Sequence, residues 1–328
     1  MRFSVSATAC IVIYATSRAS MPTTRTYTSG SSTSSTLRQW WQLYQKTRQS
    51  LVDIRVEVAS HLAICREVDQ DLAALGIKLA DAHLSMLEIG AGQLPRQTAY
   101  YAARHDVIAV DLDVVVRHSL DVTSYARMAR QNGLSRVIKT AGRKAVGFDR
   151  AYQRETCRQL GLSRLPRWRT RQMDATALAF DDDSFDFIYS YDVFEHLPNP
   201  AAVVRESARV LRPGGCMMAL IHPFTFDNGC HDLRLYLPGR GALPFWPHLR
   251  PESSADVQTF AYLNRLSHAK WGEAFAVVAP NTYWVHWPTR DPAVITAHAA
   301  ARSRGELADF TDEELLTDRL LAIWQKPM

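Results

Sequence analysis

Cysteines are few in this sequence, long apolar runs are missing, and charged residues are not in excess. The five cysteines among the 328 residues are scattered and form no CxxC pair, so neither a disulfide framework nor a thiolate zinc site is indicated. No stretch approaches the roughly 18 apolar residues of a membrane-spanning helix. Hydrophobic residues make up 47% and charged residues 22%, as in ordinary globular proteins. We therefore expect no membrane span, a reducing compartment and a cytoplasmic location.

Acidic residues are absent from the first 52 residues, which contain six Lys or Arg and a Ser/Thr-rich stretch at 23–36. A targeting peptide would show such a composition, but the apolar run at 7–15 is short and no clean cleavage site follows it. We interpret residues 1–36 as a disordered tail, whose composition cannot build a core. The alternative is a true start codon at Met21.

Residues 37–83 show the spacing of helices. Apolar side chains recur there every three or four positions, namely Leu37, Trp41, Tyr44, Leu51, Ile54, Val58 and Leu62. The pattern predicts an N-terminal helical region that covers the sheet of the following domain or its ligand cleft.

From residue 84 to residue 328, short apolar runs bounded by turn residues alternate with helical segments, as repeated βαβ units require. We expect strands at 85–89, 106–110, 169–173, 185–190 and 216–221, one more within 275–287, and a last one at 319–325. Near-continuous apolar runs are typical of parallel strands that are covered on both faces. The sequence therefore predicts an α/β domain with a doubly wound, seven-stranded sheet.

Two helices carry recognisable end signals. Asn199 and Pro200 resemble an N-cap followed by proline at the first helical position. The Pro-Gly-Gly run at 213–215 is expected to end that helix and turn the chain into the next strand. Thr311 and Glu314 match a capping box, so a short helix is expected there.

The segment LEIGAGQ at 87–93 places a glycine-rich turn directly after an apolar strand, a context in which such a motif indicates ligand binding. The third glycine of a dinucleotide fingerprint is missing, because Leu94 and Pro95 stand in its region. The carboxylate of Glu88 would also repel a negatively charged pyrophosphate. S-adenosylmethionine has no phosphate and carries a sulfonium and an ammonium. The turn therefore favours this methyl donor over NAD.

The segments LEIGAGQ, VIAVDLD, MDATALAFDDDSFDFIYSYDVFEHL and ARVLRPGG follow one another along the chain. In this order they resemble the class I S-adenosylmethionine-dependent methyltransferases with a methyltransferase type 11-like domain, and jointly they are far more specific than any one of them. The resemblance implies a Rossmann-like fold with a mostly parallel sheet, S-adenosyl-L-methionine as cofactor, and methyl transfer as the activity.

The same resemblance assigns cofactor-binding roles near the first two strands. Gly90 and Gly92 would pass beside the methionine part, and Glu88 would contact it through an amide or a water molecule. Asp111, at the end of the second strand, would accept hydrogen bonds from both ribose hydroxyls. Asp111 or Asp174 alone could be an ordinary surface carboxylate. The occurrence of all these motifs in the family's order argues against that alternative.

Further cofactor contacts are implied after the third and fourth strands. Asp174 and Ala175 match the pair that meets the adenine amino group. Tyr191 belongs to the stretch that lines the cleft between cofactor and substrate.

A catalytic base is needed only for some methyl acceptors. If the acceptor is a hydroxyl, His196 or His222 could take its proton, since both follow strand ends on the ligand side of the sheet. His196 lies in an EHL turn that many relatives carry without a catalytic role, and Pro223 beside His222 is also explained by the strand end.

We predict no metal site. Asp192, Glu195 and His196 resemble the cluster that binds a metal in the quinone-biosynthesis O-methyltransferases, and such ligands suit a divalent cation. The family nevertheless contains far more such turns than metals. The Cys-His-Asp run at 230–232 is interpreted as loop structure or as a substrate contact.

Two long insertions are expected to shape the substrate site. Residues 114–170 contain thirteen Lys or Arg and three Asp or Glu, which could attract an acidic or phosphorylated substrate or nucleic acid; a solvated helical cap is the alternative. Residues 223–287 are rich in aromatics and prolines. We interpret them as a substrate lid, with a hydrophobic core around a loop-rich insertion as the alternative.

The sequence thus predicts a methyltransferase for a small molecule or biosynthetic intermediate, acting at oxygen, with the acceptor between the basic insertion and the aromatic lid. The alternatives are an NAD-dependent oxidoreductase and a non-catalytic cofactor-binding module. RNA methylation would require the basic insertion to contact phosphates, and we do not expect nucleic acid as a partner. The sequence does not determine the oligomeric state.

Asp111 offers a direct test of the cofactor assignment. Asp111→Ala removes a charged acceptor for the ribose, so we expect the affinity for S-adenosylmethionine to fall at least tenfold, or about 1.4 kcal/mol. Isothermal titration of both chains measures the change. An unaltered affinity in the variant would show that the cofactor site has been misplaced.

Overall fold

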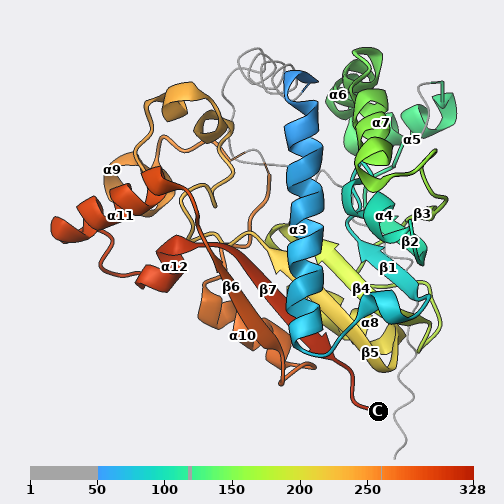
Figure 1. Ribbon diagram of the computed structural model, residues 1–328. Helices are drawn as coiled ribbons and strands as arrows, with labels where there is room; N and C mark the ends of the chain where they lie inside the picture. The colour runs from blue at the N-terminus through green and yellow to red at the C-terminus, as the bar shows by residue number, and fades with distance from the viewer. Residues whose placement is uncertain (1–50, 117–119, 260) are drawn as a thin grey trace, which may run out of the picture.

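The computed structural model describes residues 51–116, 120–259 and 261–328 of the chain. The expectations for residues 1–36 and for helices between 37 and 50 lie outside these described residues. The described residues form a seven-stranded sheet in the order β3-β2-β1-β4-β5-β7-β6, with helices on both faces (Figure 1). The predicted α/β class with a doubly wound sheet is confirmed.

The strands are β1 (Ser85–Ile89), β2 (Asp106–Asp111), β3 (Arg169–Gln172), β4 (Phe185–Tyr191), β5 (Leu211–Ile221), β6 (Tyr283–Pro288) and β7 (Thr317–Gln325). The first five pair in parallel, and β7 runs antiparallel to both β5 and β6. The predicted mostly parallel sheet is therefore confirmed. β1 and β4 are neighbours in the sheet, although 95 residues that include β2 and β3 lie between them in the sequence. The sheet therefore has its topological switch at the carboxyl ends of β1 and β4.

One predicted boundary is wrong. The Pro-Gly-Gly run at 213–215 was expected as a turn before the strand, but β5 begins at Leu211, directly after the preceding helix. Leu211 pairs with Phe185, and the register shifts before the next pair, Phe187 with Cys216. The run is therefore an irregular start of the strand, which a local pattern of turn residues cannot distinguish from a free turn.

The helices include α3 (Ile54–Ala74), α4 (Arg96–Tyr101), α5 (Val122–Asn132), α6 (Leu134–Ala145), α7 (Phe148–Leu160), α8 (Pro200–Val210), α9 (Pro251–Ser254), α10 (His268–Ala276), α11 (Pro292–Ser303) and α12 (Asp312–Leu316). The predicted end signals are present. The Asn199 side chain accepts a hydrogen bond from the Ala202 amide at the start of α8, and Thr311 and Glu314 form a complete capping box at α12. None of the helices among the described residues is long and apolar enough to cross a membrane.

The two faces of the sheet are covered by different helices (Figure 1). On one face α3 and α4 pack through Cys65, Val68, Leu72 and Tyr101 against β1, β4, β5 and β7. On the other face α8 and α10 pack against the same strands, and their fully buried side chains include Val203, Val204, Trp271 and Phe275. Both faces of the central strands are therefore dry, as their apolar sequence requires.

The basic insertion lies beyond the carboxyl ends of the strands, whereas the aromatic segment also contributes α10 on a face of the sheet and β6 within it (Figure 1). The basic insertion forms α5, α6 and α7, and α7 packs against α3 through Phe148 and Tyr152. Several of its cations pair nearby: Arg143 and Lys144 both contact the Asp149 carboxylate. The aromatic segment 223–287 contributes short helices, α10 and most of β6, and its Trp246 is fully buried in a separate cluster with α11 and α12.

Helix α3 gives a matched test of packing on the sheet. Val68 is 0% exposed and Val56 is 65% exposed on the same helix. Val68→Ala removes buried methyl groups and leaves a cavity, so we expect a loss of about 2 kcal/mol in the free energy of unfolding. Val56→Ala should change it by less than about 0.5 kcal/mol. Urea unfolding measures both, and equal effects would contradict the packing of α3 described here.

Candidate active site

The turn after β1 depends on two glycines with left-handed backbone. Gly90 has φ +79° and Gly92 has φ +65°, values that other residues adopt at a cost. A Cβ atom on Gly90 would lie 2.3 Å from Cγ2 of Val193, so the close approach of these two turns excludes any side chain there. A Cβ atom on Gly92 would meet nothing within 4 Å, so only the backbone conformation demands glycine at that position.

Asp111 ends β2 and fixes this turn. Its Oδ2 accepts a hydrogen bond from the Gly92 amide at 2.7 Å, and its Oδ1 accepts one from the Asp113 amide at 2.7 Å. Burial raises the pKa of the carboxyl, and the two backbone donors counteract this effect. Each carboxylate oxygen can accept more than one hydrogen bond, so the group retains the capacity to bind hydroxyls.

Glu88 is buried beneath the same turn. Its Oε2 accepts hydrogen bonds from Thr98 Oγ1 at 2.5 Å and from the Tyr189 hydroxyl at 3.3 Å. Burial raises the pKa of Glu88 to about 7, and the charge of Asp111 adds to the rise. A cation beside the turn would stabilise the ionised form.

A cavity of about 600 Å³ opens beside the glycine turn, within the range of roughly 300–1,000 Å³ that is usual for small-molecule sites. It is lined by the turn, by the start of α4 and by the basic insertion, with Ala91, Gly92, Gln93, Pro95, Thr98, Val115, Val116, Lys144, Asp149, Gln153, Leu165, Pro166, Arg167, Trp168 and Thr170. Of the predicted cofactor residues, Gly92 is the one that lines it.

Gln93 was not singled out from the sequence. Its side-chain amide donates to the Val114 carbonyl at 2.7 Å, and its Oε1 accepts from the Val116 amide at 3.1 Å. The side chain therefore ties the glycine turn to the chain that follows β2. Its place at the end of the glycine motif was the available signal, but its partners became visible only in the fold.

Asp174 and Ala175 follow β3 and lie near the end of β2, because the Met173 amide donates to the Asp111 carbonyl at 2.9 Å. Oδ1 of Asp174 accepts from the amide and the hydroxyl of Thr176 at 2.9 and 2.8 Å. The second oxygen is not used in these bonds. Ala175 packs against the core of the sheet. The structure thus brings this pair together with Asp111.

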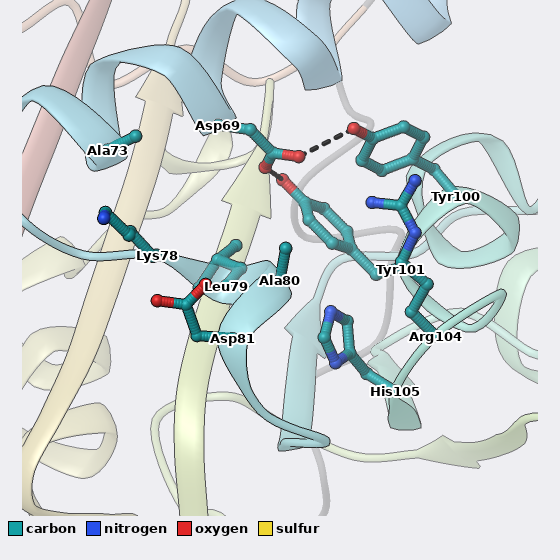
Figure 2. Close-up of a pocket in the computed structure, with 10 residues that line it drawn as sticks. All are labelled: Asp69, Ala73, Lys78, Leu79, Ala80, Asp81, Tyr100, Tyr101, Arg104 and His105. Carbon is teal, nitrogen blue, oxygen red and sulfur yellow. Dashed lines mark hydrogen bonds between the residues drawn. The ribbon is translucent and has the colours of Figure 1, made fainter.

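The Tyr191 side chain lies elsewhere. It is buried on the α3 face, with its hydroxyl 2.7 Å from that of Tyr101. Tyr101 and Tyr100 in turn both donate to the Asp69 carboxylate of α3, as Figure 2 shows. Only the backbone of Tyr191 therefore stands at the carboxyl end of β4, and its ring does not join the other predicted cofactor residues. A smaller cavity of about 190 Å³ beside this network is drawn in Figure 2.

Three histidines meet at the carboxyl edge of the sheet. His222 follows β5, and its Nδ1 lies 3.0 Å from Nε2 of His231 with the rings stacked. His196 ends the short helix η2 (Phe194–His196), and its ring centroid lies 4.9 Å from that of His231. The two predicted base candidates are therefore linked by a third histidine, which the sequence placed only in a loop.

Glu195 completes this group, and we call Glu195, His196, His222 and His231 the edge cluster. Glu195 is 3% exposed, and neither of its carboxylate oxygens has a partner at hydrogen-bond geometry among the described residues. Burial raises the pKa of Glu195 well above its usual range, and the charge of Asp192 adds to the rise. Backbone amides of Glu195 and His222 lie close enough to lower it in part.

Burial lowers the pKa values of two histidines in the edge cluster, whereas it raises that of Glu195. Burial lowers the pKa of His222 well below 6.5, and the charge of Arg319 on β7 adds to the effect. Burial also lowers the pKa of His196. Asp192 is not part of the cluster, because its Oδ1 forms an ion pair with Nε of Arg319 at 3.0 Å.

The segment from α5 to β5 matches a known family. Residues 125–219 match the family model described as a methyltransferase domain, and the sheet that they help to form has the strand order β3-β2-β1-β4-β5-β7-β6 with β7 antiparallel to β5. The chain carries a class I S-adenosylmethionine-dependent methyltransferase domain. The match includes Asp174, Tyr191 and His196 but begins beyond the glycine turn and Asp111.

Several curated proteins are similar to this chain over part of their length. A phosphatidylethanolamine N-methyltransferase of Cereibacter sphaeroides is 34% identical over 102 residues, covering 30% of this chain and 49% of the relative. A ubiquinone biosynthesis O-methyltransferase of Methylococcus capsulatus is 28% identical over 140 residues, covering 41% and 54%. The chain thus spans about half the length of the curated relatives it matches.

Among solved structures, phosphoethanolamine N-methyltransferase 2 of Haemonchus contortus in complex with S-adenosyl-L-methionine is similar to this methyltransferase domain. It is 15% identical, and the alignment covers 75% of this chain and 49% of that chain with a TM-score of 0.40.

Glu88 should make stability depend on pH. Its pKa is raised from 4.5 to about 7 in the folded state, so the folded chain binds more protons than the unfolded chain between these values, and stability falls as pH rises through them. Glu88→Gln removes this cost. We expect the variant to be more stable than the parent by up to roughly 3 kcal/mol at pH 8, with a smaller gain at pH 5. Urea unfolding at both pH values measures this, and a gain independent of pH would contradict it.

Proposed function

We propose that the methyltransferase domain moves the methyl group of S-adenosylmethionine to an oxygen atom of a small molecule. The observation that supports oxygen is the His222–His231 pair at the carboxyl edge of the sheet. Nε2 of His222 is buried without a partner at hydrogen-bond geometry among the described residues, and the Asn228 side chain lies close enough to the ring to counteract in part the lowering of its pKa by burial. A hydroxyl acceptor needs a base that can take its proton, and this nitrogen fits that role.

The glycine turn fits the methionine part of the cofactor. A Cβ atom on Gly92 would meet nothing within 4 Å, so space for a ligand lies beside this residue, whereas Gly90 allows the turn to pack against Val193. We assign the ribose hydroxyls to Asp111, whose oxygens retain acceptor capacity, and the ammonium to the neighbourhood of Glu88. A carboxylate with a raised pKa suits that neighbourhood because the cofactor brings positive charge.

The adenine is assigned to the residues after β3. Asp174 and Ala175 lie next to the end of β2, so an adenine whose ribose is held by Asp111 would reach them. The end of β4 contributes backbone at Tyr191, since the ring of that residue is engaged with Tyr101.

The residues of this chain would position the acceptor and manage its proton. Bound S-adenosylmethionine supplies an electrophilic methyl group on sulfur; in an in-line displacement the carbon–sulfur bond breaks as the carbon–oxygen bond forms. The hydroxyl proton passes to Nε2 of His222. Tyr262 and Asn264 of the aromatic segment contact η2 at this edge, and this part of the segment would keep water from the reacting atoms.

The cavity beside the glycine turn supports an acidic group in the ligand that occupies it, although none of its lining residues belongs to the edge cluster. Among its charged lining residues, Lys144 contacts Asp149 at 2.7 Å, so Arg167 supplies the net positive charge. Apolar and aromatic walls at 165–168 provide surface for the rest of a small molecule. Two similar proteins, a 27-O-demethylrifamycin SV methyltransferase and a ubiquinone biosynthesis O-methyltransferase, have names that agree with a small-molecule oxygen acceptor.

Cys65, Cys157, Cys216 and Cys230 are free thiols, in keeping with the reducing, cytoplasmic location that we propose.

Titration distinguishes the rival functions. We expect the full chain to bind S-adenosylmethionine more tightly than NAD, and tighter NAD binding would refute the methyl-donor assignment. Labelled methyl donor is then incubated with the chain and small-molecule extracts, and the products are identified by mass spectrometry. Cofactor binding without any labelled product would favour a non-catalytic module. A labelled RNA, with binding that weakens steeply with salt, would favour RNA methylation.

His222 gives the sharpest test of the acceptor atom. His222→Gln keeps a polar side chain but removes the base, so we expect kcat to fall at least 100-fold while the affinity for S-adenosylmethionine changes less than threefold. His298→Gln is the matched control, because His298 is a buried histidine of α11 that contacts Asp312 away from this edge. A normal kcat in His222→Gln would refute the proposed base.

A further inference from the structure

The edge cluster has the composition and geometry of a metal site. The ligand atoms of Glu195, His196 and His231 all lie within 4.8 Å of one another. We propose that these three residues bind a divalent transition-metal ion at the carboxyl edge of the sheet. The proposal goes beyond methyl transfer and does not depend on it, because it rests on the side chains of the cluster and is read out by metal content.

Glu195 carries the first argument. A buried carboxylate is costly unless it is hydrogen-bonded, ion-paired or bound to a metal. Both oxygens of Glu195 are buried without a partner at hydrogen-bond geometry among the described residues. Asp192, the nearby acid, adds repulsion rather than support. Arg319 is the nearest compensating charge, but its Nε pairs with Asp192. A cation bound between Glu195, His196 and His231 would therefore give the Glu195 carboxylate the partner that it lacks.

His196 carries the second argument. Its Nδ1 lies 2.8 Å from the Tyr262 carbonyl oxygen. A carbonyl only accepts, so Nδ1 must carry the hydrogen and Nε2 must present its lone pair. Histidines that bind metals are oriented in this way, with the far ring nitrogen donating to a backbone carbonyl or a carboxylate.

The backbone of η2 is held rigidly around these ligands. The Asn264 side-chain amide donates to the carbonyls of Phe194 and Leu197 at 2.8 and 3.1 Å. The Asn264 backbone amide donates to the Glu195 carbonyl at 2.9 Å. Residues 262–264 thus fix both Glu195 and His196, as the surroundings of a metal site should.

His231 reaches the cluster through an unusual backbone. It has φ +54°, a left-handed conformation that costs free energy for a residue with a side chain and that tends to occur at functional sites. Its Nε2 contacts Nδ1 of His222. His222 therefore stands beside the proposed site as a neighbour that can orient the His231 ring.

Two imidazoles and one carboxylate select the kind of ion. Nitrogen and carboxylate ligands suit zinc and similar divalent transition metals, and three protein ligands leave a position open for a further ligand. Two ligands that each lie about 2.1 Å from one ion are at most about 4.2 Å apart. Small side-chain rotations would bring ligand atoms that lie within 4.8 Å of one another to that spacing.

A second group provides an internal comparison. His268, His286 and Glu313 also have ligand atoms within 4.8 Å of one another. Glu313 is 65% exposed at its side chain, so water can satisfy it and no cation is required. His286→Gln is therefore a matched control for variants of the edge cluster.

The experiment measures zinc binding by the full chain. Protein treated with a chelator and dialysed is titrated with Zn²⁺, and its metal content after gel filtration is determined by mass spectrometry. We expect one zinc ion per chain. Glu195→Gln, His196→Gln and His231→Gln should each weaken zinc binding at least tenfold, whereas His286→Gln should leave stoichiometry and affinity unchanged. Circular dichroism and titration with S-adenosylmethionine identify variants that no longer fold.

The outcomes are decisive in both directions. Less than about 0.1 zinc ion per wild-type chain, at zinc concentrations that saturate ordinary protein sites, would overturn the proposal without any variant. Zinc binding that is lost only in His286→Gln would assign the ion to the second group and also overturn it. If one of the three variants fails to fold, a cobalt-substituted wild-type chain provides a further readout: visible absorption bands of a site with mixed nitrogen and oxygen ligands support the proposal, and their absence contradicts it. Failure of methyl transfer would leave each of these readings unchanged.

Discussion

The contact between Gly90 and Val193 is the constraint around which the site is arranged. A Cβ atom at Gly90 would lie 2.3 Å from a methyl group of Val193, so the turn after β1 and the turn after β4 pack at a distance that only glycine permits. Val193 stands directly before η2, which carries Glu195 and His196. The proposed cofactor turn and the edge cluster therefore have a fixed separation, which is what a transfer between two bound groups requires.

Much of the fold could be predicted because its signals are local. The strand at 85–89, the cap formed by Asn199 and Pro200, and the capping box at Thr311 each depend on a few adjacent residues. The glycine motif and Asp111 were also found in this way, and the fold joins them through a hydrogen bond of 2.7 Å.

Other features depend on residues far apart in the chain, which a single sequence cannot pair. The ring of Tyr191 turned away because Tyr101, 90 positions earlier, offers it a buried hydroxyl. His231 joined His196 and His222 because the aromatic segment folds back over the sheet edge. The charge of the basic insertion was visible, but the pairing of Arg143 and Lys144 with Asp149 depends on how α6 meets α7. Tertiary packing decides which of these side-chain pairings forms, and the local periodicity of the sequence does not predict tertiary packing.

The insertion of β7 between β5 and β6 has a consequence for how the chain reaches this structure. Cys216 pairs with Gln325 and Ile221 with Leu320, so roughly a hundred residues must be looped out before these hydrogen bonds can form, and closing such a loop costs conformational entropy. The looped-out stretch contains the whole aromatic segment. The more compact this segment becomes early in folding, the more often β7 can reach its position between β5 and β6. Substitutions within the segment should therefore alter the rate of folding as well as the fit of a substrate.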